Sequence, residues 1–211
     1  MKRRKIIYLV VLTALGIFIV YNSIYIETLE TKKQKNKVKN FNPGEMVNYF
    51  WENHLDKLLN NAIELEKFDS LLNNNAEYLI KQYGHAVGIT SNYCFLVNGK
   101  SKIIQVNPER LFLEFISNAK YSVIIKSIFS NTARDATGYF RVDDFENTMD
   151  FNAVSSELNS RILSEVVPGK YDTIRIGSSI SFYGAIEINE TDFFKEEFDI
   201  IPLKMNITTN E

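Results

Sequence analysis

The stretch that decides the fold is NTARDATGYFRVDDFENTMDFNAVSSELNSRILSEVV, residues Asn131 to Val167. Its second half repeats apolar residues at helical spacing, which predicts an amphipathic helix that Asp150 or Asn152 caps. The helix should end before Pro168-Gly169. The apolar positions are Phe151, Val154, Leu158, Ile162 and Val166. Strand-like segments lie on both sides, so we expect a β-barrel to close around this connection, with the helix plugging one end.

The segment before this stretch has a period of two. Runs at 93–97 and 101–106 flank Asn98-Gly99, which is typical of a two-residue hairpin turn. Further strands are expected at 110–116 and 121–129, so the four strands would form a meander.

Two more strands follow the helix. Ser179 to Ile188 alternates apolar and polar residues, and Gly184 would relieve crowding where this strand bends sharply. In the last strand, Phe198 to Ile207, Pro202 predicts that one side is unpaired. Meander, helix and two strands is the order of a small Greek-key barrel of the OB type, so we predict an α+β fold with an OB-like barrel over 91–207.

Two helical regions over 43–83 should pack outside the barrel. The first begins with a strong signal, in which Asn42 caps and Pro43 occupies the first helical position. The second covers about 67–83; the three asparagines at 73–75 should break it, and Gly84 should end it. The folded domain would therefore span 41–207.

The N-terminal region predicts a membrane anchor. A basic tail at 1–5 precedes an apolar run from Ile6 to Ile26, which is near the length that spans a bilayer. No small-x-small cleavage site follows, so we favour an uncleaved signal anchor over a cleaved signal peptide. Residues 27–40 would form a polar linker. The basic tail favours a cytoplasmic N-terminus, which places the domain outside the cytoplasm.

Charge is divided unevenly along the chain. Residues 1–40 contain nine Lys/Arg and two Asp/Glu, whereas the remainder contains fifteen and twenty-four, a net charge of -9. An acidic domain repels phosphate backbones, so we expect no nucleic-acid partner.

The candidate ligand-binding residues are Arg134 and Asp135, with Thr132 and Asn147 as lesser candidates. The planar guanidinium of Arg134 could hold a carboxylate or phosphate of a ligand. The alternative is an internal ion pair that pins this loop to the barrel, and the sequence favours that alternative.

Catalytic patterns are missing from the sequence. The acidic cluster Asp143, Asp144, Glu146 and Asp150 lacks the spacing and glycine of a calcium loop, so we expect no metal site. The single cysteine, Cys94, lies in an apolar run and reads as a buried thiol. We therefore expect no cofactor and no enzymatic activity. The alternative is an exported enzyme that uses carboxylates such as Asp135 and Asp143 as acid and base.

The segments RDATGYFRVDDFENTMDFNAVSSELNSRI, SISFYGAIEI and IIPLKM resemble a group of predicted bacterial periplasmic lipoproteins of unknown function, domain-of-unknown-function family 2291. FNPGEMVNYFWENHLDKLL and YCFLVNGK fit the same pattern, so the resemblance covers about residues 41 to 205. It implies an exported protein with an accessory role in solute uptake, beside a sugar-type ABC transporter or another envelope protein. The chain departs from the family in lacking the lipid-attachment cysteine, so anchorage would come from the apolar helix. The resemblance supplies no catalytic residues.

These observations favour a membrane-anchored extracytoplasmic accessory or binding protein over an exported enzyme. An enzyme needs two titratable groups that converge in a cleft, whereas a binding module can present a flat or aromatic-lined surface.

Overall fold

The computed structural model describes residues 8, 12, 13, 41–88, 90–114, 116, 119–167, 174–190 and 196–209. The chain divides into two compact units, Met1–Phe41 and Asn42–Glu211. The predicted anchor at 6–26 lies outside the described residues except for Tyr8, Leu12 and Thr13, which are helical. The predicted linker at 27–40 lies wholly outside them. No helix within the described residues has the length and apolar character that crossing a membrane requires.

The second unit begins with helices, as predicted. In α3 (Pro43–Asn53), the side chain of Asn42 accepts hydrogen bonds from the backbone N–H groups of Gly44 and Glu45. A short α4 (Leu55–Leu59) and the two-residue β1 (Ile63–Glu64) follow. The predicted second region is split by its asparagines into α5 (Leu65–Asn74) and α6 (Ala76–Tyr83), and Asn75 caps α6.

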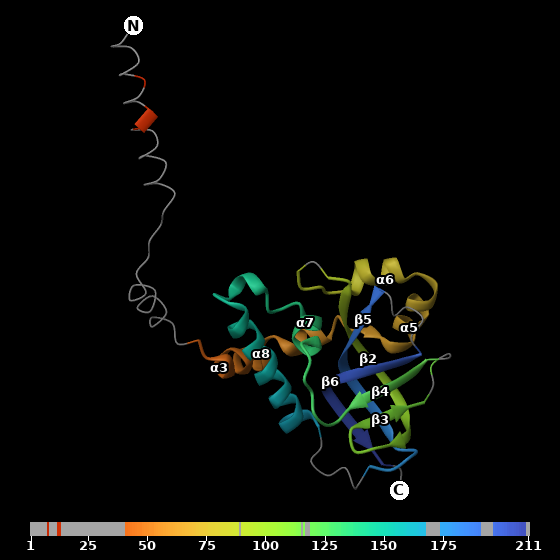
Figure 1. Ribbon diagram of the computed structural model, residues 1–211. Coiled ribbons are helices and arrows are strands. Elements are labelled where there is room, and N and C mark those ends of the chain that lie inside the picture. Colours follow the sequence, from red (N-terminus) through yellow and green to blue (C-terminus); the bar gives the residue numbers. More distant parts are fainter. Residues whose placement is uncertain are drawn as a thin grey trace. The chain divides into compact units, whose positions relative to one another are not determined.

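The strands form one closed sheet (Figure 1). They are β2 (Asn92–Val106), β3 (Arg110–Leu113), β4 (Lys120–Ile124), β5 (Ser179–Asn189) and β6 (Glu197–Thr208). Their order is β1-β2-β3-β4-β6-β5, and β5 also pairs with β2. Without β1, the barrel strands follow the order first, second, third, fifth, fourth, and the fourth pairs with the first. This order confirms the predicted OB-type barrel.

The predicted hairpin at Asn98-Gly99 is wrong. β2 continues through both residues, which pair in register with Tyr183 and Phe182 of β5. Gly99 does not form a turn; it lets the Phe182 ring and Leu65 pack close to the backbone of β2. A Cβ at this position would lie 3.1 Å from the Phe182 ring and 3.4 Å from Leu65 Cβ. The meander therefore has three strands instead of four.

Two details of the last strands follow the prediction. A Cβ on Gly184 would lie 2.4 Å from the Ile200 side chain and 2.8 Å from the Ile201 carbonyl oxygen, at an irregularity in the β5–β6 register. β4 pairs with β6 only as far as Ile200. At Pro202, β5 is therefore the only described strand that pairs with β6, so one side of β6 is unpaired there.

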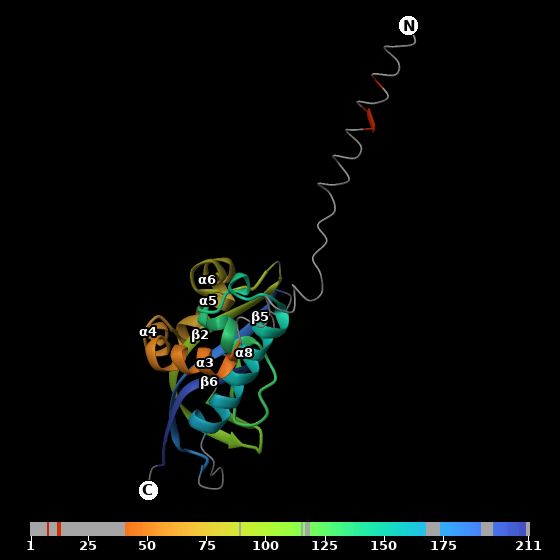
Figure 2. The same ribbon diagram turned by 90° about the vertical axis from the view of Figure 1, so that its left-hand side faces the viewer.

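Helices cover two sides of the barrel. α5 and α6 lie together at one end of the barrel, and α3 lies beside α8 (Figure 2). α8 (Thr148–Arg161) continues as a π-helical turn, η2 (Ile162–Val166), so the predicted helix is correct in extent. Its cap is Asn147, which corrects the prediction of Asp150 or Asn152.

The predicted plug needs a second correction. α8 packs mainly against α3, and the helix that contacts β2 and β5 is α7 (Thr132–Thr137), a six-residue helix in the segment predicted to be a loop. α7 lies between α8 and the strands (Figure 1).

Candidate functional site

Arg134 and Asp135 lie on α7, where they bind each other and α8. The Arg134 side chain is 3% exposed; its Nε donates to Asp135 Oδ1 at 2.6 Å and its Nη1 donates to the Phe151 carbonyl oxygen at 3.0 Å. Its guanidinium carbon also lies 3.4 Å from the centre of the Phe151 ring. These contacts are those of an internal anchor, and a ligand-binding role for the pair stays a prediction.

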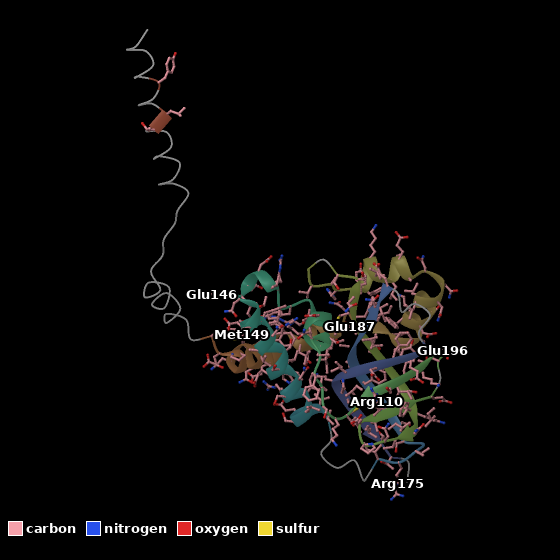
Figure 3. The ribbon with its side chains drawn as sticks, viewed as in Figure 1. Arg110, Glu146, Met149, Arg175, Glu187 and Glu196 are labelled. Atoms are coloured by element: carbon pink, nitrogen blue, oxygen red, sulfur yellow. The ribbon has the colours of Figure 1, made fainter. Side chains whose placement is uncertain are left out.

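Thr132 fastens the other end of α7 to the barrel. Its hydroxyl donates a 2.7 Å hydrogen bond to Glu187 Oε2 on β5, and Asn92 donates to Oε1 of the same carboxylate at 2.9 Å. Figure 3 labels Glu187 on the side of the barrel where α7 lies. Burial raises the pKa of the Asp135 carboxyl, Arg134 opposes that shift, and the charge of Glu187 adds to it.

The fourth predicted residue, Asn147, is separate from the other three in role. It is exposed and caps α8: its Oδ1 accepts from the Asp150 N–H at 2.9 Å, and its Nδ2 donates to the Asp150 carboxylate at 2.9 Å. The structure thus gathers Thr132, Arg134 and Asp135 on α7 and places Asn147 at a helix start.

Asp135 and Asp143, the alternative acid–base pair, lie in different surroundings. Asp143 lies on η1 (Val142–Asp144) and is exposed, whereas the carboxylate whose charge acts on Asp135 is Glu187. Cys94 is buried, and burial raises the pKa of its thiol. Within the described part of the chain, no group of three or more His, Cys, Asp or Glu side chains could hold a metal ion.

α7 covers one half of a sheet face whose other half is open. Residues opposite each other in an antiparallel pair project to the same face, and the face alternates with each residue. Cys94 and Leu96 of β2, opposite Glu187 and Ala185 of β5, belong to the half near α7. On this face, Cys94, Leu96 and Ala185 are at most 8% exposed, whereas Glu187, which accepts from Thr132, is exposed.

Beyond α7 the same face carries two rows of polar side chains across the strands. The first row is Glu64, Asn98, Tyr183 and Lys204, one residue from each of β1, β2, β5 and β6. The second row is Lys100, Ser181 and Asn206. Tyr183 is 37% exposed in the middle of the first row.

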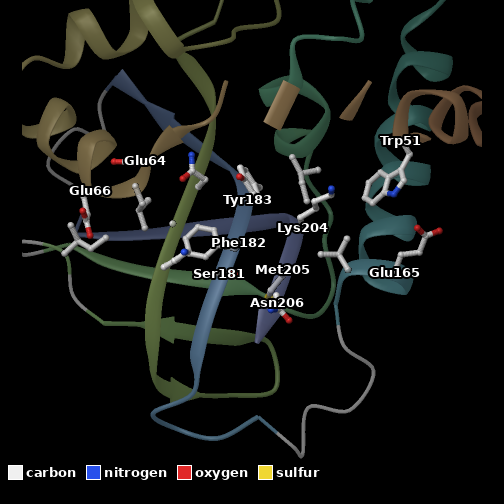
Figure 4. Close-up of a pocket in the computed structure, with 17 residues that line it drawn as sticks. Trp51, Glu64, Glu66, Glu165, Ser181, Phe182, Tyr183, Lys204, Met205 and Asn206 are labelled. Atoms are coloured by element: carbon white, nitrogen blue, oxygen red, sulfur yellow. The ribbon is translucent and has the colours of Figure 1, made fainter. Parts of the chain in front are cut away.

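These rows form the floor of a groove of about 760 Å³. The wall beyond β6 comes from Trp51 of α3 and from Glu165 and Val166 of η2 (Figure 4). The opposite end is made by Glu64, Glu66 and Leu65, at the start of α5. We call this site the sheet-face groove.

Contacts within the protein hold the wall in place. Arg161 Nε lies 3.0 Å from Glu165 Oε1, its guanidinium carbon lies 5.1 Å from the centre of the Trp51 ring, and its Nη1 contacts the side chain of Asn48. On the floor, Lys204 Nζ lies 2.5 Å from Asp56 Oδ1 of α4. The contacts of Arg161, at the end of α8, connect the Trp51 side chain on α3 with Glu165 of η2.

The sequence reasoning missed the sheet-face groove. The clean alternation over 179–188 did place Tyr183 on the polar face of its strand. The false hairpin at Asn98-Gly99 hid the neighbouring row, because it broke β2 where β2 pairs with β5.

The closed strand order and the outer helices make this an OB-type barrel protein with an open groove on one sheet face. A family model described as "Predicted periplasmic lipoprotein (DUF2291)" matches residues 14–206. The chain belongs to this family. That confirms the predicted family and indicates an extracytoplasmic, membrane-associated location.

The solved structures support the fold. A crystal structure of an OB-fold protein from Thermotoga maritima superposes with a TM-score of 0.71 at 22% identity, over 81% of this chain and 100% of that one. This similarity confirms the OB-like barrel. No curated protein matches the chain.

Proposed function

We propose that this protein is a membrane-associated extracytoplasmic binding module whose ligand lies in the sheet-face groove. The observation that carries the proposal is the contrast between the two halves of one sheet face. α7 packs over one half, whereas the other half presents Tyr183 and its neighbouring rows beside the Trp51 wall.

Three polar side chains on the groove floor are suited to binding a ligand. The side chains of Tyr183, Ser181 and Asn206 have no hydrogen bond to any residue in the described part of the chain. A site of this size with a few convergent polar groups and aromatic walls is typical of ligand binding. Asp135 does not line the groove, so the geometry favours binding over acid–base chemistry there.

The predicted N-terminal anchor and an association with transport components belong to the same proposal. Support comes from the family's extracytoplasmic character and from the accessory role in solute uptake that the resemblance implies. In this proposal the bound ligand, or the loaded domain itself, is passed to a membrane partner such as an ABC transporter.

The test is purification of the full chain from its native membrane, with mass spectrometry of the small molecules and proteins that accompany it. Tyr183→Ala should lose the small molecule, and the exposed-site control Tyr78→Ala should keep it. A small molecule held equally by both variants would overturn the groove as the binding site. Recovery of no transporter component after cross-linking would overturn the transport association.

A further inference from the structure

Resting on the proposed groove, we infer that its ligand is an uncharged polyhydroxylated chain, such as a neutral oligosaccharide. The inference follows from which polar groups of the groove are already paired within the protein and which are open.

Charged groups on the β6 side of the groove are paired. Lys204 has Asp56 as an ion-pair partner, and Glu165 has Arg161. Both pairs are partly exposed, so each adds a penalty of about 0–1 kcal/mol against a charged ligand that would replace the partner. The wall therefore offers an aromatic surface rather than a free charge.

The centre of the groove is neutral and polar. Tyr183, Ser181 and Asn206 supply two hydroxyls and an amide, which together both donate and accept hydrogen bonds. A ligand without matching groups would leave them desolvated and unpaired, at a cost of about 1–3 kcal/mol for each group. An apolar ligand is thus disfavoured.

Negatively and positively charged side chains lie close together at the β1 end of the groove. Glu64 stands beside Asn98 in the first row, and Lys100 begins the next row on the same strand as Asn98. Glu66 also lines this end. Carboxylate oxygens accept hydrogen bonds from hydroxyl groups, whereas the carboxylates of Glu64 and Glu66 would repel a polyanion at this end of the groove.

The aromatic side chains complete the match. Tyr183 lies on the floor and Trp51 on the wall, and such rings pack against the C–H faces of sugar rings while hydroxyls bond at their edges. Adjacent strands are about 4.8 Å apart, so the first row extends for about 14 Å across its four strands. That length suits a short chain of rings better than a single one.

The site differs from the usual OB surface. OB-fold proteins commonly bind ligands on their second and third strands, which here are β3 and β4. The sheet-face groove lies on the first, fourth and fifth barrel strands, with β1 and η2 added at its ends. The inference therefore rests on this groove's own side chains.

The experiment uses the full chain in detergent micelles, with intrinsic fluorescence of Trp51, the only tryptophan in the sequence. The probes are the neutral hexasaccharides maltohexaose, cellohexaose and N-acetylchitohexaose. The comparators are hexagalacturonate as a polyanion, spermidine as a polycation and penta-alanine as a peptide. At least one neutral hexasaccharide should give a saturable change, confirmed by calorimetry. Tyr183→Ala should weaken that binding about tenfold or more. Lys102→Ala, a control outside the groove lining, should leave it unchanged.

Two outcomes overturn the inference in distinguishable ways. If no neutral hexasaccharide binds up to about 10 mM, the ligand class is wrong, and the purification from the native membrane decides whether the groove is the site. If only a comparator binds and Tyr183→Ala abolishes that binding, the groove stands and the ligand class is wrong. If a neutral hexasaccharide binds equally well to Tyr183→Ala, the groove itself is wrong as the site, and the proposed function fails with it.

Discussion

Thr132 donates a 2.7 Å hydrogen bond from its hydroxyl to Glu187, and this bond ties α7 to β5. Asn92 donates to the other oxygen of the same carboxylate, so Glu187 joins the first strand of the barrel, the fourth strand and the covering helix. The bond lies in the half of the sheet face that α7 covers, and on this face Ala185 separates Glu187 from Tyr183, where the groove begins.

Removing this hydrogen bond should loosen α7. Thr132→Val keeps the shape of the side chain but deletes the hydroxyl. It should lower the free energy of unfolding by about 1 kcal/mol, the usual net contribution of a hydrogen bond, because the accepting Glu187 carboxylate is exposed to water. Chemical denaturation measures the change. Thr208→Val, at the exposed end of β6, is the matched control and should change little. Equal stability of Thr132→Val and wild type would contradict the role given to this bond.

A buried pair that joins α5 to β4 should contribute more. Tyr121, 0% exposed, donates a 2.8 Å hydrogen bond from its hydroxyl to Asp69, which is 3% exposed. Tyr121→Phe leaves the carboxyl buried without that donor and should cost about 1–3 kcal/mol in thermal or chemical unfolding. Tyr78→Phe, on an exposed tyrosine, should be neutral. A neutral Tyr121→Phe would show that water or another group replaces the bond.

Asp69 should also make stability depend on pH. Burial raises the pKa of its carboxyl in the folded protein, while hydrogen bonds from Tyr121 and Asn73 oppose the shift. Above a pH of about 4 the unfolded chain gives up this proton before the folded chain does, so stability falls as pH rises toward the folded pKa. Asp69→Asn removes the group. Relative to wild type, the variant should gain stability as pH rises through this window. A difference that stays constant with pH would contradict the shift.

Gly184 should tolerate no side chain. Gly184→Ala would drive a Cβ into Ile200 and the Ile201 carbonyl, at 2.4 and 2.8 Å. The backbone of β6 would have to move, so we expect a loss of about 1–3 kcal/mol. Ser181→Ala on the same strand is the control for a small side-chain change. Unchanged unfolding of Gly184→Ala would mean that β5 and β6 can separate at this bend without cost.

Much of the architecture could be predicted because it rests on local patterns. The cap at Asn42, the break at 73–75, the helix from Phe151 to Val166 and the bend at Gly184 each carry their cause in neighbouring residues. The hairpin predicted at Asn98-Gly99 was wrong because continuous pairing with β5 overrides the local preference for a turn. The pairing residues of β5 are more than eighty residues away in the sequence.

The groove escaped prediction for the same reason. Its first row joins Glu64, Asn98, Tyr183 and Lys204, which meet only after the barrel closes. Arg134 and Asp135 were predicted as a binding site because charged residues in a loop often bind ligands. α7 is too short for a helical period to show, and the pair's internal contacts depend on Phe151 of the next helix.

The most direct test of the division between scaffold and binding surface compares Tyr183→Ala with Arg134→Ala in the full chain. Arg134→Ala leaves the partly buried Asp135 carboxylate without its partner and should cost about 3 kcal/mol, or about 6–12 °C in Tm. It should still bind the native ligand at temperatures where it is folded. Tyr183→Ala should keep its Tm within about 2 °C and lose the ligand. The opposite pattern, with Arg134→Ala stable but unable to bind and Tyr183→Ala binding normally, would contradict the account and place the ligand at α7.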